Sequence, residues 1–255
     1  MADRTEESWR PPLLKKPENS WQRFLAAIRR WFDLQAGSAW RDLVVELAEA
    51  KGAVVDAGCG CQPYRCLLPP DVRYLGIDMV DSKDQFGYHE PDTIYYSGTT
   101  WPVADGTANL VLLTETIEHV FDTSQFLAEA QRCLRRNGLL LITVPFAARW
   151  HFIPNDFWRF TPSCLKRLLD EAGFDQIAVY ARGNAVTVAS YKIMALIQPF
   201  LLPQGCGFVS GMIKRFLGLL ASPLFVLCAV VGNLSLRGSG GDDCLGYTVL
   251  ARKPG

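Results

Sequence analysis

The stretch VVDAGCGCQPY, residues 54–64, joins an apolar run to an acidic residue and a glycine turn. The run has the β-branched character of a buried strand, and Gly58 and Gly60 follow it directly. Glycine adopts backbone conformations that other residues avoid, and it lets a ligand approach the main chain closely. We therefore predict a strand that ends at a ligand-binding turn.

Around this stretch, strand-like runs alternate with helical patterns. We predict strands at 53–57, 73–78, 93–96, 110–114, 139–145, 176–181 and 246–252, and helices at 38–52, 124–138 and 161–174. Ser38 is expected to cap the first of these helices, and Gly138 to end the second. Such alternation predicts a doubly wound, mostly parallel α/β sheet, in which ligands bind beyond the carboxyl ends of the strands.

The residues around the turn narrow the choice of ligand. Pro63 occupies the last glycine position of a GxGxxG dinucleotide pattern, and Asp56 would repel a pyrophosphate but suit a cationic amino group. About 20 residues further on, YLGID places Asp78 at the end of a strand, where a carboxylate can accept hydrogen bonds from a ribose diol. An amino acid joined to a ribose without phosphates describes S-adenosyl-L-methionine.

Five motifs in order resemble the class I S-adenosylmethionine-dependent methyltransferases of the UbiE-like (Methyltransf_11) type. They are VVDAGCGCQPYRCLL, YLGID, WPVADGTANLVLLTETIEHV, EAQRCLRRNGLLLITVPF and HFIPNDFWRFTPSCLKRLLDEAGF. The resemblance implies a Rossmann-like, mostly parallel seven-stranded sheet with an antiparallel last strand and helices on both faces. It also implies methyl transfer, which we expect at an oxygen of a small or lipid-linked acceptor.

By the same resemblance, a set of residues should bind the cofactor. Asp56, Gly58 and Gly60 would hold the methionine part, and Asp78 the ribose hydroxyls. Ser97, Gly98 and Thr99 would lie beside adenine, and Thr114 and Glu115 would face the cofactor.

Two histidines are candidates for catalysis. An oxygen acceptor needs a base, and we favour His151, after the fifth strand, with His119 as the second candidate. Asp156 and Arg159 are expected to tie the His151 loop together as an ion pair. We assign no metal ligand, but Glu115, Glu118 and His119 form an ExxEH pattern that resembles the metal-binding stretch of certain methyltransferases, so that alternative stays open.

Composition limits the partners and the compartment. Lys plus Arg and Asp plus Glu both total 26, so no overall field favours nucleic acid, and none is expected as a partner. The eight cysteines follow no disulfide or zinc spacing, which favours a reducing, cytoplasmic location. The polar N-terminus does not have the apolar region of a signal peptide.

The domain organisation has three parts. We predict a flexible tail at 1–20, a helical flap at 21–52 and the methyltransferase domain at 53–255, with an apolar helical insertion at about 188–238. Residues 21–32 and 216–236 are apolar enough to contact a membrane surface peripherally. The insertion could instead be a substrate lid, and either arrangement could include a homodimer interface.

Two other functions remain open at this point. Gln62 and Asn109 depart from the residues usual in the family, which leaves a catalytically silent, cofactor-binding scaffold at a membrane as one alternative. A nicotinamide-dependent oxidoreductase is the less favoured alternative, because Pro63 and Asp56 do not suit a dinucleotide pyrophosphate.

Overall fold

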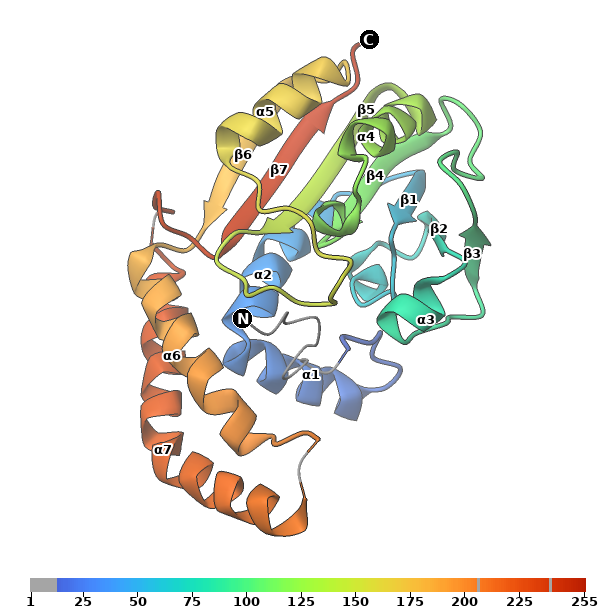
Figure 1. The fold of residues 1–255 in the computed structure, drawn as a ribbon. Helices are drawn as coiled ribbons and strands as arrows, with labels where there is room; N and C mark the ends of the chain where they lie inside the picture. Colours follow the sequence, from blue (N-terminus) through green and yellow to red (C-terminus); the bar gives the residue numbers. More distant parts are fainter. Residues whose placement is uncertain (1–12, 206, 239) are drawn as a thin grey trace, which may run out of the picture.

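The computed structural model describes residues 13–205, 207–238 and 240–255, and its strands in these ranges form one seven-stranded sheet (Figure 1). The strand order is β3-β2-β1-β4-β5-β7-β6, with β7 antiparallel to both of its neighbours and the other strands parallel. The strands are β1 (Ala53–Ala57), β2 (Arg73–Met79), β3 (Thr93–Tyr96), β4 (Ala108–Thr114), β5 (Leu134–Pro145), β6 (Asp175–Arg182) and β7 (Gly246–Arg252). The predicted fold class is confirmed.

Helices cover both faces of the sheet. They are α1 (Ser20–Phe32), α2 (Leu34–Ala48), α3 (Ser82–Phe86), α4 (Thr123–Cys133), α5 (Pro162–Glu171), α6 (Ala185–Leu201) and α7 (Phe208–Ser235), with short 3₁₀ turns η1 (Arg65–Leu67) and η2 (Ile117–His119). Successive strand residues point to opposite faces. Thus Val54 and Leu110 pack with Leu43 of α2, whereas Val55 and Val111 belong to the core under α4 and α5.

Several predicted helix ends are wrong, and the first helix also stops at Ala48, short of residue 52. We placed the end of the second helix at Gly138, but α4 ends at Cys133 and β5 begins at Leu134, which pairs with Ala108 and is fully buried. The apolar residues keep a helical spacing as far as Leu134. Burial of Leu134 in the sheet nevertheless makes it the first residue of β5.

The first predicted helix also begins earlier than expected. Asp33 caps α2 by accepting the backbone N–H of Ala36, and burial raises the pKa of its carboxyl. Ser38 lies inside the helix, where its hydroxyl donates to the carbonyl of Gln35. The sequence pattern favoured Ser38 because the actual cap, Asp33, directly follows the last residue of α1, Phe32.

The N-terminal segment contacts the domain. Of the tail that we predicted to be flexible, residues 1–12 lie outside the described part, but the Lys16 N–H donates to the Cys61 carbonyl at 3.2 Å. Arg29 of α1 donates to the carbonyl of Leu13 at 2.7 Å. Residues 13–16 are therefore held in place beside the glycine turn instead of extending freely.

Helix α1 is anchored at one end and exposed along its length. Phe32 stacks on Phe225 of α7 with ring centroids 5.8 Å apart, and Asn233 donates to the carbonyl of Trp31. No residue of α1 is buried, and Trp21 is 66% exposed. The large apolar side chains of α1, such as Trp21 and Phe24, are therefore exposed and not packed on the domain.

The predicted insertion is a helical hairpin. Helices α6 and α7 run side by side beyond the β6 end of the sheet (Figure 1). α7 is a continuous helix of 28 residues with Pro223 inside it. By length and composition alone, α7 is the single helix in the described ranges that could cross a membrane.

Topology determines how this hairpin is tethered. β6 precedes α6 and β7 follows α7, and the two strands pair with each other through Val179 and Val249. Both ends of the hairpin are therefore on the same side of any membrane it meets.

Candidate active site

A cavity of about 470 Å³ lies at the carboxyl ends of β1, β2 and β4. Seven of the predicted cofactor residues line it, together with His119: Gly58, Gly60, Asp78, Gly98, Thr99, Thr114 and Glu115. Asp56 and Ser97 do not line it. No described residue of the 188–238 insertion lines it either, so the hairpin is not a lid over this cavity.

The glycine turn is shaped by its packing on Thr116. Gly58 has φ +71°, and a Cβ atom there would lie 2.2 Å from the Thr116 Cγ2 atom. Gly60 also has a positive φ of +53°, but a Cβ atom there would meet only the Tyr88 ring, at 3.8 Å or more. Both positions need glycine for the backbone, and only Gly58 needs it for space as well.

Replacing Gly58 by alanine is expected to lower the free energy of unfolding by about 2 kcal/mol, because a left-handed backbone and a steric overlap act together. Gly60→Ala is the matched control and should cost about 1 kcal/mol from the backbone alone. Urea denaturation of both variants measures the difference. Equal losses would mean that Thr116 moves aside freely and does not shape the turn.

Asp78 organises the turn from the neighbouring strand. Its carboxylate accepts hydrogen bonds from the backbone N–H groups of Gly60 (3.0 Å) and Met79 (2.8 Å) and from the Tyr88 hydroxyl (3.1 Å). Burial raises the pKa of this carboxyl, although these three hydrogen bonds oppose the change. The side chain lines the cavity and so combines a structural role with a position suited to a ligand hydroxyl.

Asp56 lies behind the cavity wall. It is 1% exposed, and its Oδ2 atom accepts a hydrogen bond from the Tyr74 hydroxyl at 2.8 Å. Burial raises the pKa of its carboxyl to about 7, against the effect of Tyr74. We expected Asp56 to meet the amino group of the cofactor directly, but the structure gives it a contact with β2 instead.

Glu115 is held by an arginine that sequence reasoning missed. Arg182, at the end of β6, is fully buried and pairs with the Glu115 carboxylate at 2.7 Å. It also donates to the Val144 carbonyl at 2.8 Å. Glu115 has a left-handed backbone, with φ +50°, and the chain turns there, directly after the end of β4. Nothing in the sequence pattern of β6 marks Arg182, because its partner is 67 residues away.

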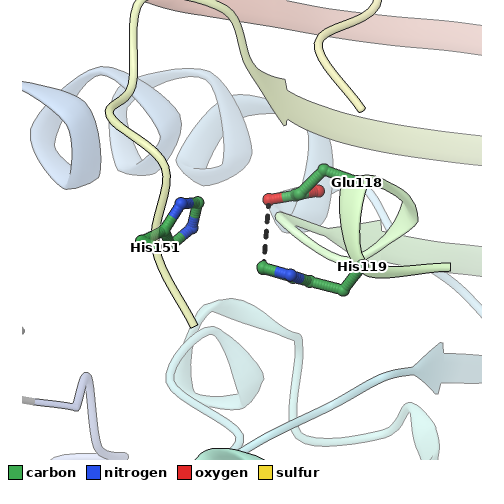
Figure 2. A group of neighbouring side chains, drawn as sticks. All are labelled: Glu118, His119 and His151. Atoms are coloured by element: carbon green, nitrogen blue, oxygen red, sulfur yellow. Dashed lines mark ion pairs between the residues drawn. The ribbon is translucent and has the colours of Figure 1, made fainter. Parts of the chain in front are cut away.

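Two histidines and a glutamate meet at the edge of the cavity (Figure 2). Glu118 and His119 come from η2, and His151 comes from the loop after β5. Glu118 is fully buried, and burial, with a contribution from Glu115, raises the pKa of its carboxyl well above the ordinary value. Burial lowers the pKa of His119 to about 4, so its imidazole is neutral at pH 7.

The His151 loop is fixed by an ion pair, as we predicted. Arg159 contacts both carboxylate oxygens of Asp156, at 2.6 and 2.7 Å. Burial opposes ionisation of Asp156, but the hydrogen bonds from Arg159 and His151 hold the pKa of its carboxyl below the ordinary value. The third histidine, His89, is exposed and stacks on Tyr95, apart from this group.

A second cavity of about 230 Å³ adjoins the first. Five of the described residues line both cavities, namely Leu13, Leu14, Tyr64, Glu115 and Phe152, whereas His151 lines only the smaller one. Tyr191 and Gln198 extend its wall onto α6. The smaller cavity therefore connects the large one with the apolar hairpin.

Comparison with known proteins decides the family. A methyltransferase domain model matches residues 32–179, which is more than half of the chain. The chain belongs to this family. With the fold described above, it is a class I, S-adenosylmethionine-dependent methyltransferase domain. The match begins before α2, so this helix, which we assigned to a flap, lies within the family's domain.

One curated protein also resembles this chain in sequence. A probable S-adenosylmethionine-dependent methyltransferase of Mycolicibacterium smegmatis is 30% identical over 135 residues, which are 48% of this chain and 51% of that protein. The chain thus matches about half the length of this curated relative.

Solved structures share the fold at low identity. The [4+2]-cyclase SpnF is 18% identical and has a TM-score of 0.54, covering 94% of this chain and 85% of its own. A SAM-dependent methyltransferase from Archaeoglobus fulgidus is 16% identical with a TM-score of 0.52, covering 92% and 100%. A Haemonchus contortus phosphoethanolamine N-methyltransferase, solved with S-adenosylhomocysteine, is 13% identical with a TM-score of 0.50, covering 85% and 52%.

The residues in the large cavity fit the family's cofactor. The Gly58–Gly60 main chain offers close approach, and the Asp78 carboxylate suits a ribose diol. The described lining of this cavity includes the acids Asp78, Glu115 and Asp122 but no lysine or arginine, which favours a sulfonium and an ammonium group over phosphates.

Proposed function

We propose that this chain transfers a methyl group from S-adenosylmethionine to an oxygen of a small or lipid-linked acceptor. One observation carries the proposal: the cofactor-type cavity shares a wall, which includes Glu115 and Phe152, with a second cavity that continues onto the apolar hairpin. A donor in the first cavity and an acceptor in the second would meet at this shared wall.

Methyl transfer is an in-line displacement, so the protein mainly aligns two groups and excludes water. The cofactor supplies an electrophilic methyl carbon, and S-adenosylhomocysteine leaves as the new oxygen–carbon bond forms. Phe86, Phe152 and His119 pack edge to face around the junction and limit water there. The acceptor proton must go to a nearby base, and the neutral His119 and the Asp156-paired His151 are the groups placed to receive it.

The first test is calorimetric titration of the purified chain with S-adenosylmethionine, S-adenosylhomocysteine and NAD in parallel. Binding of the first two in the micromolar range, and not of NAD, supports the proposal. Methyl transfer from labelled cofactor to membrane lipid extracts then tests the acceptor class. Cofactor binding without transfer to any extract would favour the silent scaffold instead.

A lipid-linked acceptor also suggests a location for the protein at a membrane surface. Large apolar side chains of α1 and α7 are exposed, including Trp21, Phe24, Phe208 and Phe216. Lys214 and Arg215 lie among those of α7, and basic residues beside an apolar face favour an anionic lipid surface. The proposed location is therefore cytoplasmic and peripheral, with the hairpin entering one leaflet from one side.

Replacing both Trp21 and Phe24 by serine is expected to weaken binding to vesicles that contain phosphatidylglycerol at least tenfold, since each exposed aromatic side chain contributes about 1 kcal/mol or more on entering lipid. Vesicle co-sedimentation measures the change. Val45→Ser is the control, because Val45 is also exposed but lies on α2. Unchanged binding of the double variant would place α1 away from the membrane.

A further inference from the structure

The group of Glu118, His119 and His151 has a donor set that the proposed function does not explain. One ligand atom from each of these residues lies within 4.8 Å of the other two. The Glu118 carboxylate is fully buried, and neither of its oxygens has a hydrogen-bond partner. Its nearest basic atom is Nε2 of His119, at 3.7 Å. A buried carboxylate without a partner is costly unless a cation or a proton compensates it.

Both imidazoles are oriented as metal ligands usually are. Nδ1 of His119 lies 2.6 Å from the Asn155 carbonyl, which fixes that nitrogen as the N–H donor. Nδ1 of His151 lies 3.0 Å from the Asp156 carboxylate and 3.0 Å from the Arg149 carbonyl. In each ring the Nε2 atom remains to bind a ligand. A metal-bound histidine typically donates its other N–H to a carbonyl or a carboxylate in this way.

We propose that Glu118, His119 and His151 bind a divalent transition-metal ion of the Zn²⁺ type. Two imidazole nitrogens and one carboxylate suit a borderline ion, whereas Mg²⁺ prefers oxygen ligands alone. Ligand atoms around a tetrahedral ion stand about 3.4 Å apart, so the most widely separated of the three ligand atoms need to approach one another by up to about 1.4 Å.

This set differs from the ExxEH alternative in the sequence. Glu115 is excluded because Arg182 holds it, and His151, which is 32 residues beyond His119, takes the third place. Three protein ligands leave a coordination position open. His119 lines the large cavity and His151 the small one, so that position lies at their junction. In a role that rests on the proposed function, the ion would bind the acceptor oxygen there and lower the pKa of its hydroxyl, in place of a histidine base.

Direct metal binding tests the site without relying on activity. The full chain is stripped with a chelator and dialysed against Zn²⁺, and bound metal is measured by mass spectrometry. One equivalent is expected for the unchanged protein and for His89→Gln, which alters the histidine outside the site. Glu118→Gln, His119→Gln and His151→Gln should each lower the affinity at least tenfold. Equal binding by these variants, or no binding by the unchanged protein, would overturn the proposal.

Two further readouts distinguish this site from metal binding by cysteines and from a protonated Glu118. Co²⁺ bound by the three residues should show visible d–d bands without a thiolate charge-transfer band. That band would instead assign the metal to cysteines such as Cys59 and Cys61. Zn²⁺ should raise the melting temperature of the stripped protein but not that of Glu118→Gln. If Glu118 is simply protonated, Zn²⁺ will raise neither.

Failure of the metal site and failure of the proposed function give different results. If S-adenosylmethionine binds and Zn²⁺ does not, only the metal site is wrong. If Zn²⁺ binds and S-adenosylmethionine does not, the metal site stands and the methyltransferase activity is wrong.

Discussion

Replacing Arg182 by methionine is expected to lower the free energy of unfolding by about 4 kcal/mol, because removing one partner of a buried ion pair leaves the other uncompensated. Arg182 is fully buried and bonds both the Glu115 carboxylate and the Val144 carbonyl. Its loss removes one donor from each of these two acceptors. Urea denaturation followed by circular dichroism measures the change.

An exposed pair of equal length is the matched control. Arg167 and Glu171 on α5 also lie 2.7 Å apart, but they are 82% and 55% exposed, so Arg167→Met should cause no measurable loss. Adding Glu115→Gln to Arg182→Met should cost much less than the sum of the two single changes, since the pair acts as a unit. Additive losses would mean that the two charges do not stabilise each other.

Replacing Asp78 by alanine should weaken binding of S-adenosylmethionine and S-adenosylhomocysteine by about 3 kcal/mol, or roughly 150-fold. The variant would lack the carboxylate that we propose accepts hydrogen bonds from the ribose hydroxyls, and the Gly60 N–H would lose the acceptor that holds the turn. Calorimetric titration of folded protein measures both affinities.

Asp84→Ala on α3 is the control for this change, because Asp84 is exposed and does not line the cavity. Its affinity should match that of the unchanged chain. A threefold effect or less for Asp78→Ala, with the melting temperature preserved, would remove Asp78 from the cofactor site.

Much of the fold follows from local pattern. The apolar runs at 53–57, 93–96 and 246–252 are strands with the predicted bounds, and Thr161 and Pro162 begin α5 as expected. Strand and helix periodicity, caps and glycine turns act over a few residues, so the sequence carries them directly. The same holds for Gly58 and Gly60 and for the acid that ends β2.

Tertiary contacts decided the rest. Arg182 meets Glu115, and His151 meets His119, across separations that no local period records. Asp56 accepts a hydrogen bond from the Tyr74 hydroxyl because it is buried in β1, next to β2, and does not reach the cavity. By itself, the sequence determined the methyltransferase family, the order of the strands and the glycine turn at Gly58 and Gly60, since these depend on neighbouring residues. Only the folded chain decided which charges are buried together, because burial depends on packing between strands and loops that are far apart in the chain.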